Sequence, residues 1–457
     1  MAPIINRLFF VNRLILVPIA SFMLSHAWAD DYATPKDIRQ TNIRQIVTLK
    51  ESLDLALQND TQWSSIQKQI QADKEVLAQS KAGLLPNINA SAETSKNKVD
   101  VENTDSNSAN SHAASIQISQ PLVNLNQWLL YQQAKKQVAQ LDSNQATEEL
   151  SLITKVTESY FNVLKAKRNL DFSQAEKQAL AKQLDHAEQR FKVGLAAMTD
   201  VHEARAAFDL AEVSVLVAQN DIHVFLEALS TLCGQSIENV RELSETFTIE
   251  KQPHTLSWWI EQATLNSPKM KAQQHALESQ KLAKKAAKAS HLPTLHLEGS
   301  HSESEGFFGG FSQPPTENTK IGLQLTIPIY QGGRTASDVR KAQALYLVQV
   351  DQLETTRRTL AQNIRILYRS IDTDRERIAA RKQSIQSAES ALNATRAGYQ
   401  VGTRNIVDVV NAQRVLLGAQ KDFALARYEF VINQLKLQET AGLLSTTFIA
   451  KVNEHLK

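Results

Sequence analysis

Three residues near position 300 have the types and the spacing of possible metal ligands. His296, Glu298 and His301 carry imidazole and carboxylate groups, which bind transition metals in proteins. On a β-strand, where side chains alternate between faces, His296 and Glu298 share one face and His301 lies on the other. We therefore interpret all three as polar residues that face solvent, and we predict no metal site.

Two further features could bind anions. Gly332-Gly333 precedes a predicted helix, and four lysines follow one another at helical spacing. A turn from strand to helix accounts for the glycines without a ligand, and a solvated helix face accounts for the lysines. The lysines are Lys281, Lys284, Lys285 and Lys288.

Motifs of catalysis are missing from the sequence. We find no phosphate-binding loop with its lysine, no nucleophile elbow and no closely spaced cysteine or histidine ligands. We predict that the protein is not an enzyme and uses no cofactor.

The first residues predict export from the cytoplasm. Residues 1–29 combine two arginines, an apolar run at 14–24 and the small-residue pattern Ala-Trp-Ala at 27–29, as in a cleavable signal peptide. A retained membrane anchor is the alternative, but the run is shorter than the roughly 20 residues that a spanning helix needs. We assign 1–29 to a signal peptide and 30–48 to an N-terminal extension.

Charge and cysteine content exclude several classes of protein. The formal charge of +2 falls to about zero when the two arginines of the signal are removed, so nucleic acid is not an expected partner. Cys233 is the only cysteine, which excludes an internal disulfide. Asp30 follows the signal, which excludes a lipidated N-terminal cysteine.

The rest of the chain repeats itself after roughly 207 residues. The order of the matching residues is kept, and one extra residue enters the second copy after its strands. Leu53, Ala56, Asn59, Pro86 and Pro121 return as Ile260, Ala263, Asn266, Pro293 and Pro328, and Tyr160, Phe191, Gly194, Asp200 and Ala204 return as Tyr368, Tyr399, Gly402, Asp408 and Ala412. We predict two structural repeats, 49–248 and 249–457.

Each repeat contains an apolar heptad pattern typical of a coiled coil. The stripes are Val156, Val163, Leu170, Leu184 and Phe191 in the first copy, and Ile364, Ile371, Ile378, Ile385, Leu392 and Tyr399 in the second. The patterns predict antiparallel helical hairpins at 125–232 and 331–440, in which one helix reaches about 100 Å. Gly194 and Gly402 are expected to close the turns at the hairpin tips, since glycine adopts the left-handed conformation without strain.

Polar residues precede the returning helix of each hairpin. Thr199 or Asp200 in the first copy, and Asn405 or Asp408 in the second, can cap the helix or place a negative charge at its positive end.

Four stretches bounded by prolines read as strands, near 87–100, 114–123, 294–303 and 320–330. Apolar residues alternate with polar ones in them, which predicts one apolar face, and the polar connections 101–113 and 304–319 are expected to be exposed loops. Strands of about ten residues can cross an outer membrane, but the smallest membrane barrels need about eight strands. We therefore expect a mainly α-helical protein with four strands per chain, whose homotrimer closes a 12-stranded barrel in contact with outer-membrane lipid.

The tip segments carry a resemblance to a known family. Arg190-Phe191-Lys192-Val193-Gly194-Leu195, with Thr199-Asp200-Val201, is one of them, and 397–404 (AGYQVGTR) is the other. With 426–428 (ARY) and 432–435 (INQL), they make the whole mature chain similar to the TolC-like outer-membrane efflux family. This resemblance implies a trimeric duct with a 12-stranded barrel and an α-helical periplasmic tunnel.

The resemblance also implies partners and site residues. A periplasmic adaptor would dock at Val193, Gly194, Leu195, Val401, Gly402 and Thr403, and an inner-membrane transporter of the RND, ABC or MFS type would supply the cargo. At the periplasmic entrance, Tyr399 and Arg404 would bond to Gln183, Thr199 or Asp200, while Asp408 would line the narrowest part. Helix capping remains an alternative role for Asp200 and Asp408.

Two positions depart from the pattern of the family. Asn411 stands where a second aspartate ring is familiar, and Arg396 stands where an acid is familiar. The entrance is therefore expected to be less negative than a double ring of aspartates, which leaves cation sensitivity of the gate open.

We hypothesise a passive outer-membrane exit duct of an efflux pump or a type I secretion system. The cargo is left open among drugs, small molecules and polypeptides. A periplasmic adaptor or structural coiled-coil protein is the alternative, but such a protein is expected to have one hairpin and compact β-rich domains of its own.

Overall fold

A computed structural model describes the chain from residue 46 onward. The signal peptide (1–29) and most of the N-terminal extension (30–48) lie outside the described residues. The described ranges are 46–99, 107–244, 252–308, 311–444 and 446–454.

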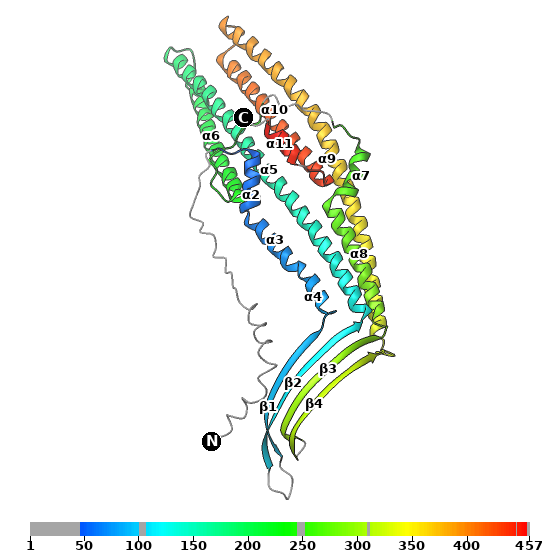
Figure 1. The fold of residues 1–457 in the computed structure, drawn as a ribbon. Helices are drawn as coiled ribbons and strands as arrows, with labels where there is room; N and C mark the ends of the chain where they lie inside the picture. The colour runs from blue at the N-terminus through cyan, green and yellow to red at the C-terminus, as the bar shows by residue number, and fades with distance from the viewer. Residues whose placement is uncertain (1–45, 100–106, 245–251, 309–310, 445, 455–457) are drawn as a thin grey trace. The chain divides into compact units, whose positions relative to one another are not determined.

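Two copies of one series of elements follow each other along the chain (Figure 1). In the first copy the helices are α2 (Leu49–Asn59), α3 (Thr61–Lys74), α4 (Val76–Ala82), α5 (Leu125–Lys192) and α6 (Met198–Cys233). In the second they are α7 (Leu256–Asn266), α8 (Pro268–Ala289), α9 (Arg334–Gln400) and α10 (Ile406–Ala441), followed by α11 (Thr446–Glu454). Helices α2 and α7, α5 and α9, and α6 and α10 end at equivalent residues, so the two copies have folded alike.

The long helices bury the predicted heptad stripes. Val156 and Val163 on α5 are fully buried, and Ile364, Ile371 and Ile378 on α9 are at most 4% exposed. The stripes loosen toward the tips, where Phe191 is 43% exposed. No helix in the described part of the chain has the length and apolarity needed to cross a membrane.

Two apolar clusters hold the helices together where the hairpins meet the shorter helices. The first surrounds Tyr160 and Phe161 of α5 and draws on α2, α6 and α11, and the second surrounds Ile364 of α9 and draws on α7. Helix α10 contributes to both, through Val431 to the first and Phe430 to the second. This one helix therefore couples the two repeats.

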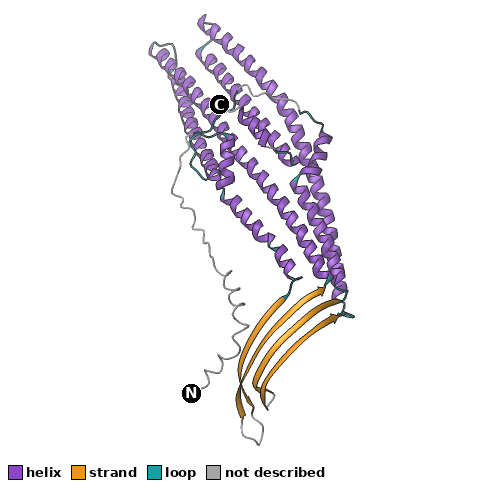
Figure 2. Cartoon of the chain, viewed as in Figure 1, coloured by secondary structure: helices purple, strands orange, loops and turns teal. Residues whose placement is uncertain are grey.

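The sheet adjoins helices α4, α5, α8 and α9 at the end of the helical region that lies away from the hairpin tips (Figure 2). Its strands are β1 (Asn87–Val99), β2 (Asn107–Val123), β3 (Thr294–Phe308) and β4 (Phe311–Thr326). They pair antiparallel in the order β1-β2-β3-β4, so the two predicted hairpins form and join through β2 and β3. Within the described residues, β1 and β4 are edge strands.

The strands are longer than the sequence indicated. Residues 107–113, which we expected in a loop, belong to β2, and β3 and β4 extend through most of 304–319. At the other end β4 stops at Thr326 instead of residue 330. Backbone pairing explains the extension, because ladder hydrogen bonds form whatever the side chain is, and residues 107–113 of β2 pair in register with residues 93–99 of β1.

Candidate functional site

The tips of the two helical hairpins have the same backbone geometry. At the first, the N–H of Leu195 donates to the carbonyl of Arg190 (2.8 Å) and the N–H of Gly194 to that of Phe191 (3.0 Å). At the second, Thr403 donates to Gly398 (2.9 Å) and Gly402 to Tyr399 (3.1 Å). Both are Schellman motifs, which require a left-handed residue. Gly194 and Gly402 supply it, with φ of 74° and 78°.

The residues around these glycines project into solvent. Val193 and Leu195 are each 68% exposed, and Val401 is 75% exposed. Thr403 is also exposed, and its hydroxyl donates to the Gly398 carbonyl. Each tip therefore presents apolar surface that none of the described residues covers.

The two aspartates near the tips both act as helix caps. Asn405 Oδ1 accepts from the N–H of Asp408 (2.8 Å), and the N–H of Asn405 donates to Asp408 Oδ2 (3.2 Å), which completes a capping box. In the first copy the N–H of Ala197 donates to Asp200 Oδ2 (3.3 Å). Alanine has no side-chain acceptor, so the first copy has half of the box.

Arg404 lies over the start of α10. Its Nη1 is 4.0 Å from Asp408 Oδ2, and the guanidinium is 62% exposed. Within one protomer this arginine therefore approaches the acid of its own tip, and not Gln183, Thr199 or Asp200, which we had expected as partners. Gln183 is half-buried on α5, while Thr199 and Asp200 are exposed on α6.

Tyr399 contacts the neighbouring hairpin through a residue that the sequence analysis missed. Its hydroxyl lies 3.5 Å from His186 Nε2, and the two rings are nearly perpendicular, at 80° with centroids 6.2 Å apart. His186 follows Gln183 by three residues, so both occupy one face of α5. That spacing was the available signal for His186.

A second polar link between the hairpins also escaped the sequence analysis. Arg414 Nε on α10 lies 2.6 Å from Glu176 Oε1 on α5, and the glutamate side chain is only 13% exposed. Arg205 and Glu188 join α6 to α5 at 2.8 Å within the first hairpin. The remaining predicted entrance residues, Asn411 and Arg396, are exposed.

Side chains divide the sheet into two chemically different faces. Cross-strand partners place isoleucines, leucines and alanines together on one face near the helices, and serines, asparagines and glutamines together on the other. The apolar face is exposed in the protomer: Ile88 is 64%, Ile321 79%, Leu323 67% and Leu325 60% exposed. A sheet with this pattern is suited to a wall with lipid on one side and water on the other.

The histidines of β3 lie as their alternation indicated. His301 is on the apolar face, where its Nδ1 is 2.9 Å from Thr319 Oγ1 and its Nε2 is 3.9 Å from Glu303 and from Glu317. His296 and Glu298 are on the other face. Among the described residues, no three histidine, cysteine, aspartate or glutamate side chains gather as metal ligands would.

Comparison with known proteins gives consistent matches along the chain. Residues 52–235 and 259–443 match the family described as outer membrane efflux protein. Outer membrane protein TolC of Vibrio cholerae is 34% identical over 421 residues, which cover 90% of this chain and 94% of that protein.

A secretion protein and a solved channel extend the likeness. The alkaline protease secretion protein AprF of Pseudomonas aeruginosa is 25% identical over 87% of this chain and 84% of its own length. The crystal structure of the Campylobacter jejuni CmeC outer membrane channel superposes with a TM-score of 0.75 at 19% identity and covers 90% of both chains.

Proposed function

Because the chain belongs to the family of outer membrane efflux proteins, we propose that three copies of it form the passive exit duct of an export system that crosses the outer membrane. One observation carries this proposal. Each chain offers four antiparallel strands with an apolar face and two open edges, and the long helical hairpins continue from the same strands. Open sheet edges do not persist in lipid, whereas a closed ring of three sheets has none.

Adaptor and pump complete the proposed assembly. The apolar tips around Gly194 and Gly402 are the docking surface for a periplasmic adaptor, and an inner-membrane transporter of the RND, ABC or MFS type supplies cargo and energy. The duct itself contributes no chemical step. Its role in the assembly is to open or close a passage for the cargo.

The gate of this duct consists of the polar contacts near the tips. Tyr399 with His186, Arg414 with Glu176 and Arg404 with Asp408 tie the second hairpin to the first or to itself. Gln183, Thr199, Asp200, Arg396 and Asn411 complete the entrance in the proposed trimer. An adaptor that binds the open arrangement more tightly shifts the equilibrium toward it by that difference in affinity.

Fractionation and conductance test the duct. We expect the folded protein in the outer-membrane fraction, as a trimer in mild detergent that forms steady pores in planar bilayers. Recovery of a folded, soluble periplasmic protein would support the alternative, a periplasmic adaptor. The exposed apolar face of the sheet argues against that alternative, since a soluble protein rarely exposes so large a patch.

A genetic comparison can identify the class of cargo. Deletion of the gene should either increase susceptibility to several drugs or remove proteins from the culture medium. The first result assigns the duct to efflux and the second to type I secretion, and an unchanged strain in both assays contradicts export.

A further inference from the structure

The two edges of the sheet carry the same order of outward side chains. On β1 the residues that face outward, counted away from the helices, are Ile88, Ala90, Ala92, Thr94 and Lys96. On β4 they are Leu325, Leu323, Ile321, Thr319 and Glu317. Each edge therefore has three apolar residues, then a threonine, then a charge, and the two charges are opposite in sign.

Neither Lys96 nor Glu317 has a close partner of opposite charge among the described residues of its own chain. Among the described residues, Lys96 has no ion pair, and its cross-strand neighbour on β2 is Asn110. Glu317 stands directly opposite Glu303 of β3, a like charge, and the His301 ring lies 3.9 Å from its carboxylate. The glutamate side chain remains 69% exposed.

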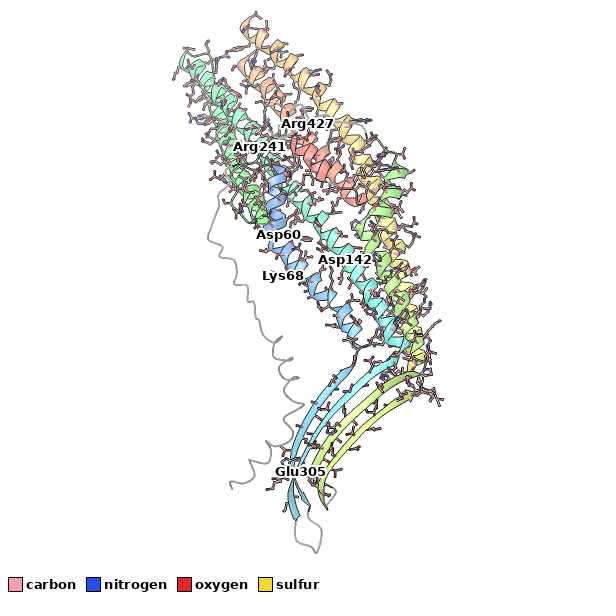
Figure 3. All side chains as sticks on the ribbon, in the orientation of Figure 1. Asp60, Lys68, Asp142, Arg241, Glu305 and Arg427 are labelled. Atoms are coloured by element: carbon pink, nitrogen blue, oxygen red, sulfur yellow. The ribbon has the colours of Figure 1, made fainter. Side chains whose placement is uncertain are left out.

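The carboxylates on this side of the sheet form a wider negative area. Glu305 continues the outward row of β3 toward the end of the sheet that lies away from the helices (Figure 3). Like charges directly opposite one another destabilise a pair of strands. A cation beyond the β4 edge would relieve this repulsion, and the β1 edge carries one.

We propose that Lys96 on β1 of one copy pairs with Glu317 on β4 of the next copy, in a seam that also sets Thr94 opposite Thr319 and Ala92 opposite Ile321. This inference rests on the proposed trimer and names the register in which its sheets join. An even number of strands makes the two edges antiparallel where copies meet, so the seam continues the up-and-down order. The register keeps the apolar band continuous around the wall, whereas a slip by one residue would turn the outward side chains of one edge inward.

Disulfide cross-linking tests the seam in the full-length protein. Lys96 and Glu317 of the same chain are separated by three strand spacings, which is at least about 14 Å, so a bond between cysteines at these positions must join two chains. Cys233 is fully buried and does not interfere. We expect the K96C/E317C variant to form covalent dimers and trimers on mild oxidation, while each single variant does not.

A matched control moves one cysteine to the other face of β4. Asn318 is next to Glu317 in sequence but points to the opposite side of the sheet. The K96C/N318C variant should therefore cross-link much less than K96C/E317C. Equal cross-linking of the two would overturn the proposed register.

Charge reversal gives an independent readout of the same pair. Lys96→Glu and Glu317→Lys should each speed dissociation of the oligomer in denaturing detergent by roughly two- to fivefold, and the double reversal should restore most of the loss. Additive effects would contradict a pairing. Conducting trimers that show neither the cross-link nor the coupling would overturn the seam alone, whereas a lone non-conducting subunit would overturn the duct and the seam together.

Discussion

Tyr399 on α9 places its hydroxyl oxygen 3.5 Å from Nε2 of His186 on α5, so the second helical hairpin touches the first close to the tips. The perpendicular packing of the two rings adds apolar contact to this polar one. In the proposed gate, the tyrosine therefore contacts a histidine of its own chain.

The first prediction concerns this contact. Replacing Tyr399 with Phe and Arg404 with Ala removes the hydroxyl near His186 and the cation near Asp408, which should favour the open entrance and raise single-channel conductance in planar bilayers. Tyr346→Phe, on the same helix but far from the tips, is the control and should leave conductance unchanged. Wild-type conductance in the double variant would contradict the proposed gate contacts of Tyr399 and Arg404.

The second prediction concerns a buried carboxylate. Asp374 on α9 is 5% exposed and accepts from Asn433 Nδ2 on α10 and from Arg377 Nη2, each at 2.7 Å. Asp374→Ala leaves the Asn433 amide without this acceptor and should cost about 1–3 kcal/mol of stability. Thermal unfolding in detergent measures the loss.

A neighbouring aspartate provides the control for that experiment. Asp372 is 58% exposed and pairs with Arg375 at 3.2 Å on the surface of the same helix. Asp372→Ala should change stability by no more than about 0.5 kcal/mol. Equal losses for both variants would mean that the contact with Asn433 contributes nothing.

The third prediction concerns pH. Burial raises the pKa of Glu439 above its ordinary value of 4.5, the hydrogen bond from the Thr154 hydroxyl lowers it in part, and the charge of Glu158 raises it further. The folded state therefore holds the proton more tightly than the unfolded state, so this group favours folding at low pH. Its contribution is lost as the pH rises from 4.5 through the raised pKa.

Glu439→Gln should remove this dependence. The melting temperature of the wild type should fall relative to that of the variant as the pH increases through this range. Glu376→Gln, at an exposed position on α9, is the matched control. A constant difference between wild type and E439Q across the range would contradict the prediction.

The fourth prediction compares two glycines with similar backbones. Gly402 and Gly442 have φ of 78° and 70°, so alanine is strained by about 1–2 kcal/mol at either position. A Cβ at Gly402 would meet open space, whereas one at Gly442 would lie 2.6 Å from the Asn266 carbonyl oxygen. Gly442→Ala should therefore lower the melting temperature clearly more than Gly402→Ala, and equal shifts would show that the close approach relaxes without cost.

Much of the fold could be predicted from the sequence because its signals are local and repeated. Heptads that include Val156 and Ile364 mark the buried stripes, and Gly194 and Gly402 mark the turns between helices. The strand ends could not be read from composition, since serine and asparagine suit a loop and a water-facing strand equally. The repeat boundaries at 49–248 and 249–457 stay a prediction.

The contacts between helices were harder to predict than the helices. Asp374 lies between Ile371 and Ile378 on the buried stripe, where Asn433 on the partner helix and Arg377 on its own helix satisfy the carboxylate. The equivalent residues of the first copy, Ala166 and Phe225, are apolar. His186 was missed because its role depends on a contact with Tyr399, which is more than 200 residues away in the sequence.

The two tips of each chain share one backbone turn but end differently, in Leu195 at the first and in Thr403 at the second. A trimer would therefore present six tips at its rim, alternating between leucine and threonine. Six identical adaptor subunits docked on that rim would occupy two kinds of binding site in alternation. Their ring would have threefold symmetry in its contacts even where its own fold is sixfold.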